Sequence, residues 1–209
     1  ALKAGVNPKK IVFSGVGKTS NEISYAIDKK ILLINAESKS EIIEIERIAK
    51  IKKRIVNIGI RLNPNTDAKT LKQISTGKKE NKFGVNEKMF FELVKYSNIS
   101  KNINLKCLSV HIGSQILDHK PYEKMLNVID KIIKKSNHKF EFIDLGGGMG
   151  ISYEKNNKKL NYQKYNFAIK KFLKNHKSKI IFEPGRSIVG SIGSLISKVI
   201  YIKENDKKD

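Results

Sequence analysis

The chain has 209 residues, 39% of them hydrophobic, and a formal net charge of +22 at pH 7. This length supports one sizeable hydrophobic core rather than two. No stretch approaches the roughly 18 uninterrupted apolar residues of a membrane span, so we expect no membrane association. Residues 1–10 lack the apolar core of a signal peptide, which predicts a cytoplasmic protein.

A single cysteine, Cys107, excludes an internal disulfide framework and any cysteine-rich zinc site. It stands in the apolar segment LKCLSV, where a lone cysteine is expected to belong to the core rather than to act as a nucleophile. This cysteine usage fits a reducing compartment.

The positive charge invites a nucleic-acid-binding interpretation, because lysines and arginines gain affinity by neutralising phosphates. Subtracting the four arginines from the 42 basic residues leaves 38 lysines, spread over every helix-like segment. Nucleic-acid readers favour the bidentate arginine fork, so we expect no nucleic-acid partner. The lysine excess is instead typical of solvated faces encoded by an AT-rich genome, which makes each arginine individually informative.

Six short apolar runs, most of them separated by amphipathic helical patterns, predict repeated βα units and a parallel sheet. The runs cover residues 11–14, 31–35, 56–62, 105–111, 140–145 and 179–182. The helical patterns cover residues 40–51, 86–97, 122–135 and 162–175. Residues 194–204 alternate like a further strand and are followed by a charged tail.

The apolar runs are nearly continuous, as in strands buried on both faces of a doubly wound sheet or a TIM barrel. Polar and glycine-rich motifs follow these runs, at the carboxyl edge where both architectures bind ligands. A barrel needs eight strands and the chain offers six runs, so the count alone leaves the two architectures open.

Three familiar ligand motifs are excluded. GVGKTS has Val12 where a P-loop requires its first glycine, and GGGMG is followed by Ile151 where a dinucleotide fingerprint requires its third. His111 and His119 lack the spacing and the partners of a zinc site, so we expect no metal.

Three strand-end motifs carry the positive signal. Gly146–Gly148 can bring backbone N–H groups close to a phosphate, although a plain tight turn is the alternative. EPGRS (183–187) places a carboxylate and a rare arginine at the next strand end, and HIGSQ (111–115) offers an imidazole and a hydroxyl. Taken alone, EPGRS could be a turn with a surface ion pair, and HIGSQ could contain a structural histidine. Together at one sheet edge they indicate a planar, phosphorylated cofactor.

The sequence resembles the diaminopimelate decarboxylases, which share the fold-type III barrel with alanine racemase and ornithine decarboxylase. The resemblance rests on FSGVGKT (13–19), STGKKENKFG (75–84), HIGSQ (111–115), DLGGGMG (144–150) and EPGRSIVG (183–190). It implies an α/β fold in which residues 1–190 form about strands 3 to 8 of a pyridoxal-phosphate-binding (β/α)8 TIM barrel. Residues 191–209 would begin the strand that leads into a C-terminal β domain.

The resemblance also assigns roles. His111 would stack on the pyridine ring, Glu183 would face the ring nitrogen, and Arg186 would lie near the phosphate and the substrate carboxylate. The implied cofactor-binding set is His111, Ser114, Gly146, Gly147, Gly148, Glu183, Pro184, Gly185, Arg186 and Arg61.

Glu183 has a clear chemical purpose in this scheme. Decarboxylation leaves a carbanion that the cofactor absorbs only while its ring nitrogen is protonated. A carboxylate beside that nitrogen favours the protonated form. An arginine at this position would have argued for a racemase.

The resemblance implies further parts that are not in these residues: two strands and the covalent cofactor lysine upstream of residue 1, and a C-terminal domain that completes the partner's site in a homodimer. We therefore expect this stretch alone to be inactive and, with two open sheet edges, prone to aggregate. The implied reaction is decarboxylation of meso-2,6-diaminopimelate to L-lysine. Decarboxylation of another basic amino acid (ornithine, arginine or carboxynorspermidine) and a non-catalytic pyridoxal-phosphate-binding barrel remain alternatives.

Overall fold

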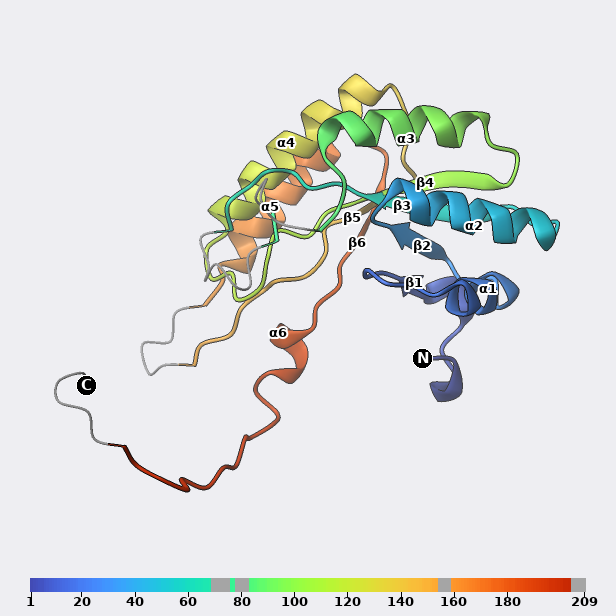
Figure 1. Cartoon of the computed structure of the whole chain (residues 1–209). Helices are drawn as coiled ribbons and strands as arrows, with labels where there is room; N and C mark the ends of the chain where they lie inside the picture. Colours follow the sequence, from blue (N-terminus) through green and yellow to red (C-terminus); the bar gives the residue numbers. More distant parts are fainter. Residues whose placement is uncertain (69–75, 78–82, 154–158, 204–209) are drawn as a thin grey trace.

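A computed structural model of the chain describes residues 1–68, 76–77, 83–153 and 159–203. Its centre is one sheet of six parallel strands that follow one another in chain order, with helices over the outer face (Figure 1). The strands are β1 Val12–Phe13, β2 Leu33–Ala36, β3 Val56–Arg61, β4 Ile103–Ser109, β5 Phe142–Asp144 and β6 Lys179–Ile181. Each overlaps one of the six apolar runs, so the predicted parallel α/β sheet is confirmed.

Within the residues that the structure describes, six α-helices and two short 3-10 helices connect and flank these strands. The helices are α1 Ser20–Asp28, α2 Lys39–Ile51, α3 Glu87–Ile99, α4 Lys120–Ser136, α5 Tyr162–Leu173 and α6 Arg186–Val189, with 3-10 turns at Leu2–Ala4 and Pro8–Lys10. The sequence patterns identified α2 to α5 and missed α1 and the single turn of α6. Only Ile23, Ala26 and Ile27 of α1 are buried, and three residues are too few to form a recognisable helical repeat of apolar positions. Its N-terminus is instead marked by a capping box between Thr19 and Glu22.

Both faces of the sheet are buried, which distinguishes this architecture from a sheet with one solvated side. On β2, Ile34 and Ala36 belong to the large cluster that packs against the helices. Leu33 belongs instead to a second, smaller cluster with Cys107 and Phe142. The two clusters therefore lie on opposite faces of the sheet, since successive strand residues point to opposite sides, and Cys107 is a core residue as expected.

A buried lysine ties the loop after β1 to the start of α2. Lys18 donates to the carbonyl oxygens of Gly15 and Asn35, and its Nζ lies 2.6 Å from Oε1 of Glu41. Its side chain is 1% exposed, so the charge depends on these partners. This contact sets the position of the β1 end relative to β2.

The expected strand over residues 194–204 is not formed in residues 194–203, the part that the structure describes. Leu195, Ile196 and Tyr201 are more than 90% exposed in this extended segment. Alternating apolar residues make a strand only where a neighbouring strand supplies hydrogen bonds, and none lies beside them here. That residues 191–209 lead into a further β domain stays a prediction. Among the described helices, none has the length and apolarity needed to cross a membrane.

Candidate active site

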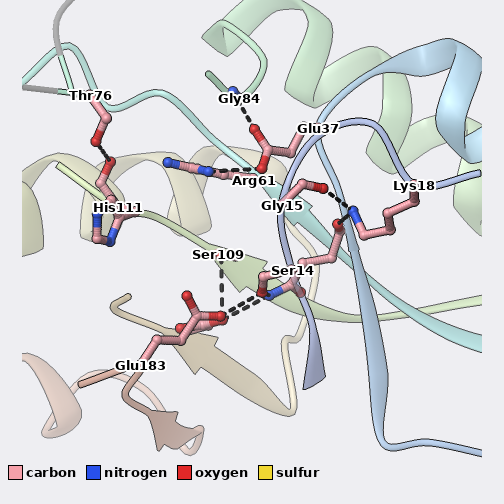
Figure 2. A network of polar contacts seen from close by, with 12 residues as sticks. Ser14, Gly15, Lys18, Glu37, Arg61, Thr76, Gly84, Ser109, His111 and Glu183 are labelled. Carbon is pink, nitrogen blue, oxygen red and sulfur yellow. Dashed lines mark hydrogen bonds and ion pairs between the residues drawn. The ribbon is translucent and has the colours of Figure 1, made fainter. Parts of the chain in front are cut away.

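The three sequence motifs meet because their strands are in register. Ser109, Asp144 and Ile181 are paired across β4, β5 and β6. His111, Gly146 and Glu183 each follow two residues later. Parallel strands end at the same sheet edge, so these three positions form one continuous rim, and Figure 2 shows His111 and Glu183 on this side of the sheet.

Hydrogen bonds donated by backbone N–H groups connect the loops at this rim. The N–H of Glu183 donates to the carbonyl oxygen of Gly146 at 2.8 Å, and the N–H of Gly147 donates to Nδ1 of His111 at 3.1 Å. The glycine turn is therefore joined directly to both neighbouring motifs. The structure brings together three residues predicted from sequence to share one ligand.

The glycine turn has no space for side chains. A Cβ atom on Gly147 would lie 2.1 Å from the carbonyl oxygen of Glu183. Gly148 has φ +87°, and its Cβ would lie 2.2 Å from the carbonyl oxygen of Gly113. Glycine is needed at both positions because the neighbouring loops approach the bare backbone.

The loop HIGSQ lies against the segment that follows the glycine turn. The side chain of Gln115 donates to the carbonyl oxygen of Ile151 at 2.6 Å and accepts from its N–H at 3.2 Å. The N–H of Ile116 also donates to the carbonyl oxygen of Gly148 at 2.9 Å. These contacts hold Ser114, which is half-buried, in the same group of loops.

A polar chain leads from Glu183 into the sheet. Ser14 donates its hydroxyl to Oε1 of Glu183, and Asn35 donates to Ser14 at 3.0 Å. The same Asn35 amide donates to Oδ2 of Asp144 at 2.8 Å, while Oδ1 of Asp144 accepts from the N–H of Gly146. Two carboxyl groups are thus linked through β1 and β2.

Burial, followed by the negative charge of Glu183, raises the pKa of Asp144 to about 7, whereas the hydrogen bonds from Gly146 and Asn35 oppose the shift. Asp144 is fully buried, so its charged form is disfavoured. The Asp144 carboxyl group is therefore partly protonated near neutral pH.

Arg61, the last residue of β3, lies at the same rim. Its Nη1 donates to Oε1 of Glu37 at 2.8 Å, and its guanidinium lies over the ring of Phe83 at 5.2 Å from the centroid. Burial and the charge of Arg61 lower the pKa of His111, while Glu183 and Glu37 oppose this effect. The imidazole is therefore neutral in this site.

Arg186 contacts Tyr153 rather than Glu183. Its Nη1 donates to the Tyr153 hydroxyl at 2.7 Å, and its guanidinium lies over that ring. The surface ion pair considered for the EPGRS motif is therefore wrong. Glu183 accepts a hydrogen bond from Ser14, and Arg186 contacts Tyr153. Pro184 and Gly185 are exposed beside them.

Four of the polar residues at this rim were missed by sequence reasoning: Ser14, Asn35, Glu37 and Asp144. Three of them were marked in the sequence as polar residues within apolar runs: Ser14 and Asn35 end such runs, and Asp144 interrupts one. Glu37 had no such mark, and its partner Arg61 stands 24 residues away in the sequence.

The rim fits a planar phosphorylated cofactor. The glycine turn offers backbone without side chains, and a neutral imidazole, a carboxylate and a guanidinium lie around it. A Cβ on Gly185 would meet nothing within 4 Å, so space remains on the open side.

Residues 1–190 match the family model described as the pyridoxal binding domain of the pyridoxal-dependent decarboxylases. The chain belongs to this family, and its cofactor is the pyridoxal phosphate expected from the motifs.

Among its relatives, the chain is 44% identical over 211 residues to diaminopimelate decarboxylase of Helicobacter pylori strain J99, covering 100% of this chain and 52% of the relative. It is 39% identical to that of Aquifex aeolicus, covering 50% of the relative. A crystal structure of the Helicobacter pylori enzyme complexed with L-lysine has a TM-score of 0.85 at 43% identity, covering 90% of this chain and 48% of that one. The resemblance and the partial barrel are therefore confirmed, and the chain spans about half the length of the curated relatives it matches.

Proposed function

We propose that the protein carrying this chain is a pyridoxal-phosphate-dependent carboxy-lyase that converts meso-2,6-diaminopimelate to L-lysine and CO2. The observation that carries the proposal is the position of Gly147, whose backbone contacts the His111 side chain and the Glu183 loop at once. The substrate follows from relatives named diaminopimelate decarboxylase at 39% to 44% identity and from the related structure with L-lysine.

Each residue at the rim has a task in this proposal. The backbone of Gly146, Gly147 and Gly148 receives the phosphate, since such turns bind anions through N–H groups. His111 packs its neutral ring against the pyridine. Glu183 holds a proton on the pyridine nitrogen, because a nearby negative charge favours the cationic form.

The cofactor, when bound, supplies an electron sink for the carbanion that forms on loss of CO2. Arg186 supplies a positive charge for the phosphate and the substrate carboxylate, and Tyr153 orients its guanidinium. Ser114 and Arg61 complete the cofactor contacts. Following the family resemblance, we also propose a cytoplasmic homodimer whose second subunit completes each site.

The test is release of CO2 by the purified full-length protein, saturated with pyridoxal phosphate, from meso-2,6-diaminopimelate, L-ornithine and L-arginine in parallel. The proposal expects L-lysine from the first substrate and far slower turnover of the others. Preference for L-ornithine or L-arginine would overturn the substrate assignment. Cofactor binding without CO2 release from any of them would overturn the enzymatic assignment.

A further inference from the structure

Glu37 lies outside every motif used so far, yet its carboxylate joins two parts of the site. It follows β2 directly, and its side chain is 4% exposed. Oε1 accepts from Nη1 of Arg61 at 2.8 Å, and Oε2 accepts from the N–H of Gly84 at 3.2 Å. Figure 2 shows both contacts. One carboxylate therefore connects the ends of β2 and β3 and the turn at Gly84.

The Arg61 guanidinium needs such a partner because little of it reaches water. Its side chain is 14% exposed, and Phe83 covers the guanidinium. A buried charge without a countercharge is strongly disfavoured, so the direction in which the Arg61 guanidinium points depends on Glu37. Gly84 restrains the Glu37 carboxylate in turn, because its N–H donates to Oε2.

The environment of Glu37 explains why it stays in place. Its own N–H donates to Oε2 of Glu41 at 2.8 Å, and Glu41 is paired through its other oxygen with Lys18. The backbone of Glu37 is thereby held independently of the contacts that its side chain makes.

We propose that Glu37 is a positioning residue that aims the Arg61 guanidinium at an anionic group of the bound cofactor. The inference rests on the proposed function for the identity of that cofactor. Glu37 acts through Arg61 and touches neither cofactor nor substrate. Its influence reaches His111 as well, because Arg61 and Glu37 have opposite effects on the charge state of that imidazole.

Glu37→Gln in the full-length protein isolates the charge of the carboxylate, because the amide oxygen can still accept from Gly84. Glu44→Gln is the matched control on α2: Glu44 also pairs with an arginine, Arg47, but the pair lies at the surface. Arg61→Gln and the double variant complete a mutant cycle. The readouts are the dissociation constant of pyridoxal phosphate, from its absorbance, and the pKa of His111, from NMR of labelled imidazoles.

We expect Glu37→Gln to weaken cofactor binding on the order of tenfold, by analogy with the loss of a group that orients a metal ligand. The pKa of His111 should fall further, because the positive charge of Arg61 is no longer offset. Arg61→Gln should raise the pKa of His111. The double variant should bind the cofactor no more weakly than Arg61→Gln alone, and Glu44→Gln should match the wild type.

Wild-type affinity and an unchanged pKa of His111 in Glu37→Gln would overturn the inference. If that variant does not fold, the double variant decides, since it removes both charges together. Affinity equal to that of Arg61→Gln supports action through Arg61, and much weaker affinity overturns it. Turnover of meso-2,6-diaminopimelate by the wild type tests the proposed function separately, because the two readouts here do not depend on decarboxylation.

Discussion

The backbone N–H of Gly147 donates to Nδ1 of His111 across 3.1 Å. A nitrogen that accepts a hydrogen bond carries no proton, so the neutral ring has its proton on Nε2. The same glycine lies against the carbonyl oxygen of Glu183. One peptide unit therefore fixes the tautomer of the imidazole and joins it to the loop that carries the carboxylate.

The surroundings of His111 predict a mostly neutral imidazole near pH 6.5, where an ordinary imidazole is half protonated. Burial and Arg61 lower the pKa of His111, so the folded protein binds fewer protons there than the unfolded one. Nitrogen-15 NMR of the cofactor-free full-length protein measures this directly, with the urea-unfolded protein as reference. A signal that titrates at or above the reference value would contradict the assignment.

Gly147→Ala should disrupt the site through backbone displacement. The new Cβ would lie 2.1 Å from the carbonyl oxygen of Glu183, so the loop after β6 must move. We expect pyridoxal phosphate to bind at least about tenfold more weakly, a loss of roughly 1.4 kcal/mol. Gly193→Ala is the control, because its Cβ would meet nothing within 4 Å. Equal cofactor affinity of both variants in an absorbance titration would show that the turn does not contact the ligand.

Asp144 predicts a distinctive pH dependence of stability in the cofactor-free protein. Its pKa is raised from 3.8 to about 7, so between these values the folded state holds a proton that the unfolded state has released. The free energy of unfolding should therefore fall as the pH rises through this window, by at most roughly 1.4 kcal/mol per unit. Asp144→Asn removes the titration and should flatten the profile.

Urea unfolding between pH 4.5 and 8 compares the two profiles. Glu141→Gln serves as control, because Glu141 is a surface carboxylate paired with Lys106. A wild type whose stability keeps the same offset from Asp144→Asn across the window would mean that Asp144 is ionised throughout.

Glu183→Gln should separate cofactor binding from catalysis. The amide can still accept from Ser14, so the polar chain behind it survives. Loss of the negative charge lowers the pKa of the pyridine nitrogen by ~1–3 units, which predicts a fall in kcat of about 10- to 1000-fold. Cofactor affinity should change much less. Measurement of kcat and of the dissociation constant on one preparation checks this, and an unchanged kcat would remove Glu183 from the chemistry.

Sequence reasoning found the sheet and the rim for the same reason. Near-continuous apolar runs mark strands buried on both faces, and side chains placed after such runs reach the edge where parallel strands end. His111, Gly146 and Glu183 could be predicted in this way because each stands two residues beyond its strand.

Contacts between segments that are distant in the sequence could not be predicted. Glu37 and Arg61, or Asn35 and Asp144, are adjacent only through strand register, which a single sequence does not specify. The alternation over 194–204 predicts a strand that residues 194–203 do not form in the structure, because a strand needs a neighbouring strand for its hydrogen bonds.

The most direct test is a crystal structure of the full-length protein with pyridoxal phosphate. Our account predicts the phosphate within hydrogen-bonding distance of the backbone at Gly146–Gly148, the pyridine ring against His111, and its nitrogen beside the Glu183 carboxylate. A cofactor bound at another edge of the sheet, or one whose nitrogen faces away from Glu183, would contradict it.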